Sequence, residues 1–496
     1  MSYTAVAVYS GTDEATNYKA SIKGDISGNT MTKIGTLEGV NLATCTQSAV
    51  YVDHWATVTG NISNNKIDDV RENGIYAHKN SVVGGNINDN TISNAKKAGI
   101  CAYANSQIKG DISNNTVTDP GSYGIYISDS SEVSGTISNN TIKTPGSDGI
   151  RISTSKANAI EQNKVENAGK NGVSVASGST VTSINKNTIS LNSPKGGNAI
   201  TVTEKSTATN ITGNNISGKM NIAIKVDEPN GKTTITSNKI TTSNSSKQSF
   251  RGIYVNEAKN NQATIQKNTI TGNKSSYGVY VAMSKAVITG NTVSKSSFPV
   301  CYVQNKYKMK VSKNKYKANK KNKTRVLYNI KSAKLSKTKY VYNKKVNTPT
   351  LSAVKGYKNN KTLKKGTEYT VSLSKGRKNV GIYKYTLTGK GIYTGTFVKK
   401  FTIVPQKAAV KSAKAGAQKI TVTAKKAAKA YGGSQLLIRY KVAGGSWRYA
   451  TTSAAKKVIS GLESGKKYTV SVCAQKKSGS TWIKGAWSSN KTVKVK

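Results

Sequence analysis

Apolar and polar residues alternate in short runs along residues 1 to about 328, and the runs return at a nearly fixed period. The repeated unit is Ile-x-x-Asn-x-apolar, as in ISNNKI and INDNTI. Most of its asparagines are 23 to 27 residues apart, which suits one solenoid coil of three short strands and is too short for paired-helix repeats. The pattern predicts a β-solenoid. The repeated asparagines are Asn29, Asn65, Asn90, Asn115, Asn140, Asn163, Asn187, Asn214, Asn238, Asn268, Asn291 and Asn314.

A second unit follows most of these asparagines by about ten residues. It reads Gly-Ile or Gly-Val, then one variable residue and another apolar residue, as in GIYA, GIYI and GVYV. Alternation of this kind predicts a short strand with one face toward the core. We expect the Ile, Val and Leu side chains to stack from coil to coil.

The repeated asparagine lies between two strands of one coil. A sharp corner needs left-handed backbone, which Asn tolerates, and the side-chain amide can bond the turn of the next coil. We interpret the series as a structural asparagine ladder. A row of ligand-binding side chains is the alternative.

These repeats resemble those of the right-handed parallel β-helix superfamily, over about two-thirds of the chain. That superfamily includes pectate-lyase-like enzymes, uronan epimerases, phage tailspikes and many adhesins. The resemblance implies the fold but not the activity, because the same solenoid supports enzymes and inert stalks.

In the strand built on the second unit, the variable residue is expected to face solvent, so that reading it coil by coil gives a column. Neighbours in such a column are about 4.8 Å apart, the spacing of paired strands. The column is predicted to hold Tyr51, Tyr76, Cys101, Tyr126, Arg151, Ser174, Thr201, Lys225, Tyr254, Tyr280 and Tyr302. A second outward column, two residues later, is predicted to hold Asp53, His78, Tyr103, Ser128, Ser153, Ala176, Thr203, Asp227, Asn256, Ala282 and Gln304.

Titratable groups are densest where the two columns pass the first coils. The chain's two histidines, His54 and His78, fall in adjacent coils beside Asp53. An insertion of about 19 residues follows Asn29 and lies next to them in the sequence. Long loops in compact repeats are often functional, so we expect this insertion to form a wall of a site.

Two functions fit these columns. In the first, the solenoid binds polysaccharide, because tyrosine rings offer flat amphipathic faces to sugars. In the second, it is a polysaccharide lyase or uronate epimerase, for which the resemblance implies that a base removes the proton next to a uronate carboxylate and that an acid or cation steadies the enolate. We expect His78 or His54 to move the proton and Arg151 to hold the carboxylate. The predicted catalytic residues are His78, His54, Asp53, Tyr76 and Arg151, and the predicted substrate-binding residues are Tyr51, Tyr103, Tyr126, Tyr254, Tyr280 and Tyr302. The alternative to both is a structural stalk, in which stacked tyrosines stiffen the sheet without binding anything.

Other kinds of site find less support in the sequence. The clustered calcium-binding carboxylates of pectate lyases do not occur, because Asn61 and Asn86 separate Asp25 from Asp111, and all four are expected at turns. No closely set carboxylate pair suggests glycoside hydrolysis. Four distant cysteines without a CxxC pair indicate neither a zinc site nor a redox dithiol. We therefore expect no metal and no cofactor.

The pattern changes after about residue 328. Residues 329–405 resemble bacterial immunoglobulin-like repeats of wall-associated proteins, through the segments NVG, GKGIYTG and FTI. Residues 406–496 resemble a fibronectin type III module, through the segment GLESGKKYTV. The predicted fold class is all-β: a right-handed parallel β-helix over residues 1–328, followed by two small β-sandwich domains.

The formal net charge of +54 belongs mainly to the later part of the chain. Residues 1–304 hold 28 basic and 20 acidic groups, whereas residues 305–496 hold 48 basic and two acidic ones. Lysine dominates, which favours diffuse attraction to polyanions over bidentate recognition. The expected partner is a polysaccharide or an anionic cell-wall polymer. Nucleic acid is less favoured, because no nucleic-acid-binding motif occurs. A basic surface without any polymer partner is the alternative.

The modules are of kinds found outside cells, so we expect an extracellular or cell-wall protein. The start, MSYTAVAVYS, lacks the basic and apolar parts of a signal peptide, and we expect that an N-terminal segment is missing. No run of eighteen apolar residues predicts a membrane span. Our interpretation is a surface protein that binds glycan through the solenoid and uses the basic modules as spacer and electrostatic anchor.

Overall fold

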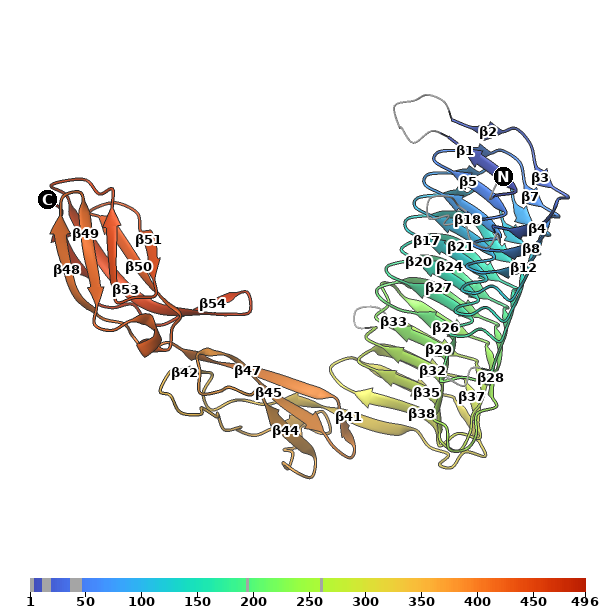
Figure 1. Cartoon of the computed structure of the whole chain (residues 1–496). Helices are drawn as coiled ribbons and strands as arrows, with labels where there is room; N and C mark the ends of the chain where they lie inside the picture. The colour runs from blue at the N-terminus through green and yellow to red at the C-terminus, as the bar shows by residue number, and fades with distance from the viewer. Residues whose placement is uncertain (1–3, 11–18, 36–46, 193–195, 259–261) are drawn as a thin grey trace. The chain divides into compact units, whose positions relative to one another are not determined.

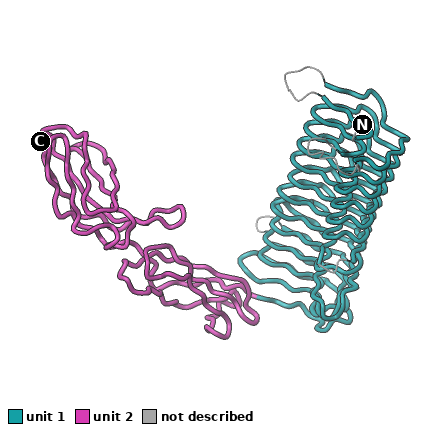
Figure 2. Tube along the Cα trace, viewed as in Figure 1, with its two compact units in different colours: residues 1–327 teal, residues 328–496 magenta. Residues whose placement is uncertain are grey.

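The structure is a computed structural model of the chain, and it describes residues 4–10, 19–35, 47–192, 196–258 and 262–496. It divides into two compact units, unit 1 (residues 1–327) and unit 2 (residues 328–496), which Figure 2 shows in different colours. In these described ranges the helical structure is one short 3-10 helix, Ala428–Tyr431, and no helix has the length and apolar character needed to cross a membrane. The predicted all-β class is confirmed, as a β-solenoid followed by small sheets.

Unit 1 is a stack of coils whose strands form three long parallel sheets (Figure 1). Each strand pairs with the equivalent strand of the next coil. The first sheet contains β1 (Val6–Tyr9), β5 (Val50–Asp53), β9 (Ile75–His78), β13 (Ile100–Tyr103), β17 (Ile125–Ser128), β20 (Ile150–Ser153), β23 (Val173–Ala176), β26 (Asn198–Val202), β29 (Ile222–Asp227), β32 (Phe250–Asn256), β35 (Ser276–Ala282) and β38 (Phe298–Gln304).

The other two sheets form the remaining sides of each coil. The second sheet contains β2 (Ser21–Ile22), β3 (Ile26–Ser27), β6 (Thr57–Val58), β7 (Ile62–Ser63), β10 (Val82–Val83), β11 (Ile87–Asn88), β14 (Gln107–Ile108), β15 (Ile112–Ser113), β18 (Glu132–Ser138), β21 (Lys156–Glu161), β24 (Thr180–Asn185), β27 (Thr207–Thr212), β30 (Thr233–Thr236), β33 (Gln262–Gln266), β36 (Lys285–Thr289) and β39 (Met309–Ser312). The third sheet contains β4 (Thr30–Ile34), β8 (Lys66–Val70), β12 (Thr91–Ala95), β16 (Thr116–Thr118), β19 (Thr141–Lys143), β22 (Lys164–Glu166), β25 (Thr188–Asn192), β28 (Asn215–Lys219), β31 (Lys239–Thr242), β34 (Thr269–Thr271), β37 (Thr292–Ser294) and β40 (Lys315–Lys317).

Inward-facing Ile and Val side chains form the core of unit 1. Ile62, Ile87 and Ile112, for example, are paired in register on neighbouring strands, and each is almost fully buried. Burying a side chain of this size contributes roughly 1.5–3 kcal/mol. The core is therefore a set of columns in which each coil packs mainly on its two neighbours, as the sequence predicts.

The glycine that opens the second repeat unit is required by close packing. At Gly124, a Cβ atom would lie 2.4 Å from Ile142 Cγ2 and 2.6 Å from the backbone oxygen of Gly149. Gly99 is enclosed in the same way, with Val117 Cγ1 at 2.4 Å. A larger residue would push this corner away from the core.

The predicted asparagine ladder is confirmed, with one correction. Asn90 Nδ2 donates to Asn115 Oδ1 at 2.9 Å and to the Ile62 carbonyl at 2.8 Å, and Asn115 in turn donates to Asn140 Oδ1 at 2.9 Å. The left-handed backbone lies one residue earlier than predicted, as at Asp89, whose φ is 57°. The preceding residue turns the chain, which leaves the buried asparagine amide free to point along the stack.

The corner residues Asp25, Asn61, Asn86 and Asp111 form a second column of turns. The backbone N–H of Asn61 donates to Asp25 Oδ1 at 2.6 Å, and that of Asn86 donates to Asn61 Oδ1 at 2.8 Å. Asp111 continues the series, with its N–H 2.8 Å from Asn86 Oδ1. These contacts agree with the expected role as turn residues.

Unit 2 holds two large apolar clusters among its described residues, one between Ile330 and Ile403 and one between Ala408 and Val495, and a small third one of Val380, Val404 and Ile483. Its sheets are small and mainly antiparallel, in contrast to unit 1. The predicted domains at 329–405 and 406–496 stay a prediction. The strands are β41 (Arg325–Ser332), which crosses from unit 1, β42 (Lys339–Val341), β43 (Lys355–Gly356), β44 (Tyr369–Leu373), β45 (Gly381–Gly389), β46 (Tyr393–Thr394), β47 (Thr396–Val404), β48 (Val410–Gly416), β49 (Lys419–Ala424), β50 (Gln435–Val442), β51 (Arg448–Thr452), β52 (Lys456–Ser460), β53 (Lys467–Ser478), β54 (Thr481–Lys484) and β55 (Lys491–Lys494).

Candidate functional site

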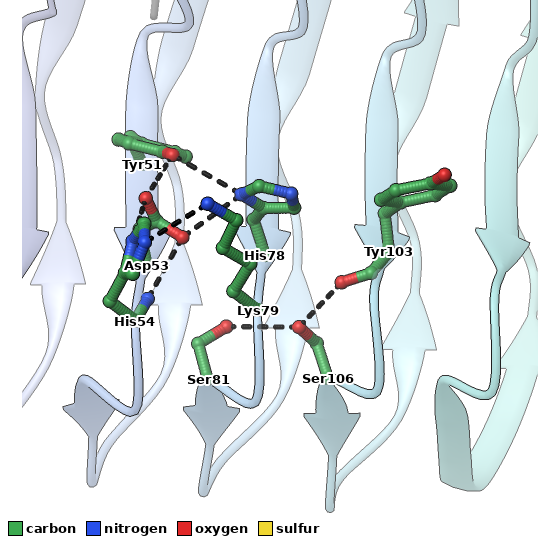
Figure 3. A network of polar contacts seen from close by, with 8 residues as sticks. All are labelled: Tyr51, Asp53, His54, His78, Lys79, Ser81, Tyr103 and Ser106. Atoms are coloured by element: carbon green, nitrogen blue, oxygen red, sulfur yellow. Dashed lines mark hydrogen bonds and ion pairs between the residues drawn. The ribbon is translucent and has the colours of Figure 1, made fainter. Parts of the chain in front are cut away.

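Six of the predicted site residues lie together on the outward face of the first sheet, on β5, β9 and β13 and the turn after β5. The register places Tyr51 beside Tyr76, and His78 beside Tyr103. Figure 3 shows most of this group, with Tyr51, His78 and Tyr103 on successive strands. We call the group the N-terminal cluster: Tyr51, Asp53, His54, Tyr76, His78 and Tyr103.

A buried carboxylate organises the cluster. Asp53 is 2% exposed, and its Oδ1 lies 2.9 Å from His78 Nδ1 and 2.8 Å from the backbone N of His54. Its Oδ2 accepts a hydrogen bond from the Tyr51 hydroxyl. Burial acts to raise the pKa of Asp53, but the hydrogen bonds from His78 and Tyr51 outweigh burial and hold the pKa below its ordinary value. Asp53 is therefore an anion that holds its neighbours in place.

The turn after β5 folds His54 back onto this carboxylate. His54 and Trp55 have φ of 51° and 61°, so two successive left-handed residues end the strand. His54 Nδ1 lies 2.5 Å from Asp53 Oδ2, although without hydrogen-bond geometry. Lys79 Nζ lies 3.0 Å from His54 Nε2. An ammonium can only donate, so Nε2 accepts and the ring proton of His54 is assigned to Nδ1, facing Asp53.

His78 presents its other nitrogen outward. Its Nδ1 is held by Asp53 and lies 3.3 Å from the Tyr51 hydroxyl, and the side chain is 16% exposed. In the part of the chain that the structure describes, no hydrogen bond or ion pair involves His78 Nε2. A carboxylate on Nδ1 fixes the tautomer in which Nε2 carries the lone pair. His78 can therefore accept a proton from a molecule bound on the sheet.

The rings of the cluster form a stacked ledge. Tyr51 and Tyr76 stack at 5.5 Å between ring centroids, Tyr76 and His78 at 5.0 Å, and His78 and Tyr103 at 5.8 Å. Burial, with smaller contributions from Cys101 and Tyr51, raises the pKa of Tyr76 well above its ordinary value, so its phenol stays neutral. Tyr103, at 36% exposed, forms the outer edge of the ledge.

Five predicted site residues lie apart from the cluster, and Arg151 and Tyr126 are the nearest of them along the sheet. Arg151 is three strands beyond Tyr76 in register, about 14 Å along the sheet. Its Nη1 lies 3.0 Å from the buried carboxylate of Asp148, which occupies the guanidinium. Tyr126 stacks on Tyr123 at 4.5 Å. Neither Arg151 nor Tyr126 can contact the same sugar ring as His78.

The predicted columns need two corrections. Tyr280 pairs with Cys301, whereas Tyr302 pairs with Val281 and packs against the core, so Tyr302 does not belong to the outward tyrosine column. The same one-residue shift in register removes Gln304 from the second column. Both faces of the strand segment FPVCYV are apolar, so the sequence pattern does not indicate which of its residues face the core. Seven members expected to face solvent are instead buried: Cys101, Ser174 and Thr201 of the first column, and Asp53, Ser128, Ser153 and Ala176 of the second.

The sequence interpretation missed residues that support the column from the side. In four coils, the residue directly before the repeat glycine lies against the outward residue that comes two positions after that glycine. The sequence pattern that could have identified these residues is X-Gly-Ile/Val-X, in which the two X residues contact each other. The pairs are Tyr123 with Tyr126 at 4.5 Å, Asp148 with Arg151 at 3.0 Å, Arg251 with Tyr254 at 5.2 Å and Tyr277 with Tyr280 at 5.5 Å.

The predicted insertion after Asn29 lies largely outside the described residues, which omit residues 36–46. Within the described ranges, no three His, Cys, Asp or Glu side chains are grouped so that they could hold a metal ion.

Comparison with protein families decides the handedness of the solenoid. Residues 48–216 and 108–250 match the family described as "Right handed beta helix region". Residues 48–250 are a right-handed β-helix region. This range contains the whole N-terminal cluster and the second outward column as far as Asp227.

Comparison with solved structures does not extend the assignment beyond the β-helix region. The chain is similar to the FN1–FN3 domains of chicken CNTN1, with 13% identity and a TM-score of 0.18, over 35% of this chain and 66% of that one. It is also similar to consecutive domains of titin, with 13% identity and a TM-score of 0.17, over 34% of this chain and 67% of that one. Scores of this size do not establish a shared fold. No curated protein matches the chain.

Proposed function

We propose that this β-helix protein binds glycan at the N-terminal cluster. The observation that carries the proposal is the ledge of Tyr51, Tyr76, His78 and Tyr103, whose ring centroids are 5.0–5.8 Å apart. Aromatic faces pack on the apolar faces of sugar rings, while phenol and imidazole groups at the ring edges hydrogen-bond sugar hydroxyls. The buried Asp53 holds the rings in a fixed geometry, so little conformational entropy is lost on binding.

The basic residues of unit 2 suit an anchoring role at an anionic polymer. Residues 328–496 hold 38 basic and two acidic groups, most of them lysine. Lysine ammonium groups attract polyanions without a defined geometry. An extracellular or cell-wall location, where such polymers and glycans occur together, is part of this proposal.

Loss of the outer ring tests the binding site. In Tyr103→Ala, we expect the affinity for a bound polysaccharide to fall roughly tenfold, about 1.4 kcal/mol, because one stacking face is removed. The full chain is titrated against a panel of acidic and neutral polysaccharides. Tyr449→Ala is the matched control, since Tyr449 is 58% exposed and lies in unit 2. Equal affinity of Tyr103→Ala and the unchanged protein would rule out the ledge as the binding site.

A second candidate function is β-elimination or epimerisation of an acidic polysaccharide, which the Asp53–His78 pair favours. His78 Nε2 would remove the proton next to a uronate carboxylate. In a lyase, the electron pair left behind forms a C=C bond as the glycosidic C–O bond breaks, and the leaving oxygen takes a proton from water. Lys79, 3.0 Å from His54, supplies positive charge near the developing enolate.

Turnover separates the two functions. The lyase predicts a rise in absorbance in the ultraviolet band of unsaturated uronates, an epimerase predicts an altered uronate ratio, and both changes should be lost in His78→Ala. Binding without either change supports a binding protein. Absence of both binding and turnover supports the structural stalk.

A further inference from the structure

The outward face of the first sheet carries a second aromatic group, far along the stack on β32 and β35. Tyr254 and Tyr280 are paired in register and stack at 5.8 Å, with an angle of 25° between the rings. The guanidinium carbon of Arg251 lies 5.2 Å from the centroid of each ring. A cation so placed is attracted to the negative faces of both rings. We call these three residues the Arg251 cluster.

Arg251 lacks polar partners of the kind that Arg151 and Arg325 have. Arg151 pairs with Asp148, and Arg325 donates to the Tyr277 hydroxyl at 2.9 Å. Over the described residues, by contrast, Arg251 has no carboxylate within ion-pair distance, and its buried Nε has no hydrogen-bond acceptor. No carboxylate of the described residues therefore neutralises the Arg251 guanidinium, and an anion bound at its Nη groups would do so.

The nearest carboxylate on the preceding strand is already engaged. Asp227 Oδ2 lies 3.4 Å from Lys225 Nζ, and its Oδ1 accepts from Asn256 Nδ2 at 2.9 Å. Lys225 is beside Tyr254 in register, so it adds positive charge at the edge of the Arg251 cluster. Burial raises the pKa of Tyr280 to about 12, which keeps its phenol neutral at neutral pH. The cluster thus presents one cation beside two stacked, uncharged aromatic rings.

We propose that Arg251, Tyr254 and Tyr280 form a second subsite, which binds a negatively charged sugar unit of the same polymer that the N-terminal cluster binds. The proposal rests on the proposed glycan-binding function. The rings supply sugar-stacking faces, and the guanidinium supplies bidentate hydrogen bonds to a carboxylate or sulfate.

The two sites are held at a fixed separation. Tyr76 on β9 and Tyr254 on β32 belong to one sheet and are seven strands apart, which is about 34 Å at the spacing of paired strands. A short oligosaccharide can occupy either site alone, whereas a long one can occupy both. Linked binding at two sites raises the apparent affinity by about 10²-fold or more without any new contact.

Length and charge of the ligand provide the test. The full chain is titrated calorimetrically with an oligogalacturonate tetramer, a dodecamer and a methyl-esterified dodecamer, whose carboxylates are blocked. Salt is kept near 0.15 M, where a screening length of about 8 Å weakens diffuse attraction to lysine. We expect two tetramers bound per chain, and at least about tenfold tighter binding of the acidic dodecamer than of the tetramer.

Substitutions assign these effects to residues. Arg251→Gln should bind one tetramer and lose the advantage of the longer ligand, while Lys156→Gln, which removes an exposed positive charge from the second sheet, should behave like the unchanged protein. Arg251→Lys keeps the charge but not the planar fork, and should show an intermediate length effect. If Arg251→Gln unfolds at a lower temperature than the unchanged protein, Arg251→Lys and Tyr280→Ala replace it in the comparison.

The outcomes separate this proposal from the proposed function. One tetramer per chain, lost in Tyr103→Ala and with no length effect, would overturn the second subsite and keep the N-terminal site. Equal affinity for the acidic and methyl-esterified dodecamers would overturn the anionic specificity. No binding of any oligomer by the unchanged protein would overturn both proposals for this class of polymer.

Discussion

At the scale of single residues, Asp53 determines how the N-terminal cluster is arranged. A carboxylate that is 2% exposed would normally be unfavourable, but hydrogen bonds from the side chains of His78 and Tyr51 compensate for the lost water. Those same bonds fix the tautomer of His78 and the orientation of the Tyr51 ring. The electrostatic and the stacking properties of the ledge therefore depend on one side chain.

The contribution of Asp53 to stability should depend on pH. The pKa of this carboxyl is lowered in the folded protein, so the stability it provides is fully present above its ordinary pKa of 3.8 and is lost as the pH falls through the lower folded value. We expect Asp53→Asn to reduce the free energy of unfolding by about 1–3 kcal/mol at pH 7, with a smaller difference below about pH 3. Chemical denaturation across this range measures it.

Asp129→Asn is the control for this prediction, because Asp129 is exposed in the corresponding turn of a later coil, where asparagine tolerates the left-handed backbone. A difference between Asp53→Asn and the unchanged protein that grows as the pH falls would contradict the assigned direction of the pKa shift.

The residues of the two aromatic clusters differ in how far the sequence predicts their contacts. His54, His78 and Asp53 could be grouped from spacing alone, because the coil period brings positions 25 residues apart onto neighbouring strands. Lys79, which is 25 residues after His54, could have been grouped in the same way, but the direction of its side chain depends on the left-handed turns at both residues. Arg251 was missed because alternation assigns residues three apart to opposite faces, whereas the backbone at Gly252 returns Arg251 to the face of Tyr254.

At the scale of the elements, the asparagine ladder links every coil of unit 1 to the next. Each ladder amide before Asn314 donates to the side chain of the next coil and to a backbone carbonyl, as Asn115 does with Asn140 and Ile87. Such a chain of buried hydrogen bonds is strong only while it is complete, because an interrupted ladder leaves donors without acceptors.

Interrupting the ladder should therefore cost more than one ordinary hydrogen bond. In Asn115→Ala, the side-chain and backbone N–H groups of Asn90 both lose their acceptor, and we expect unit 1 to lose about 2–4 kcal/mol. Denaturant unfolding followed by far-ultraviolet circular dichroism measures the loss.

Asn215→Ala is the comparison for the ladder variant, because Asn215 is exposed at the start of β28, and it should change stability by less than about 0.5 kcal/mol. Similar losses in the two variants would show that the ladder is not a special source of stability.

The elements themselves were largely predictable. The period of Asn and the Gly-Ile/Val unit predicted the strands of the first sheet and their order, since every coil repeats the same side-chain sequence. The predicted strand register was wrong near Cys301, because apolar residues occupy both faces of that strand. The position of the left-handed corner, one residue before each ladder asparagine, depends on which amide reaches the next coil and has no compositional signal.

At the scale of the whole molecule, the two kinds of binding should respond differently to salt. Raising the salt from 0.1 M to 1 M shortens the screening length from about 10 Å to about 3 Å, which weakens attraction between exposed lysines and a polyanion. Stacking of sugars on Tyr103 and its neighbours involves no net charge. We expect binding of the full chain to heparin to collapse over this range, while Tyr103-dependent binding to a neutral polysaccharide persists.

Surface immobilisation of each polymer, with the chain injected at both salt concentrations, measures these affinities. Salt-resistant binding to heparin would contradict a diffuse lysine-driven anchor and would require a shaped anion site in the basic part of the chain.

The regular period of the coils also makes unit 1 a ruler whose length changes in fixed steps. Asn163 and Asn187 are 24 residues apart and occupy equivalent corners, so excision of residues 164–187 would join Asn163 to Thr188 at the same kind of corner and bring it next to Asn214 in the ladder. Each coil that is added or removed changes the length of unit 1 by about 4.8 Å. Under the two-site proposal, gain or loss of a coil between the N-terminal cluster and the Arg251 cluster would change the polymer length needed to reach both, without altering either cluster.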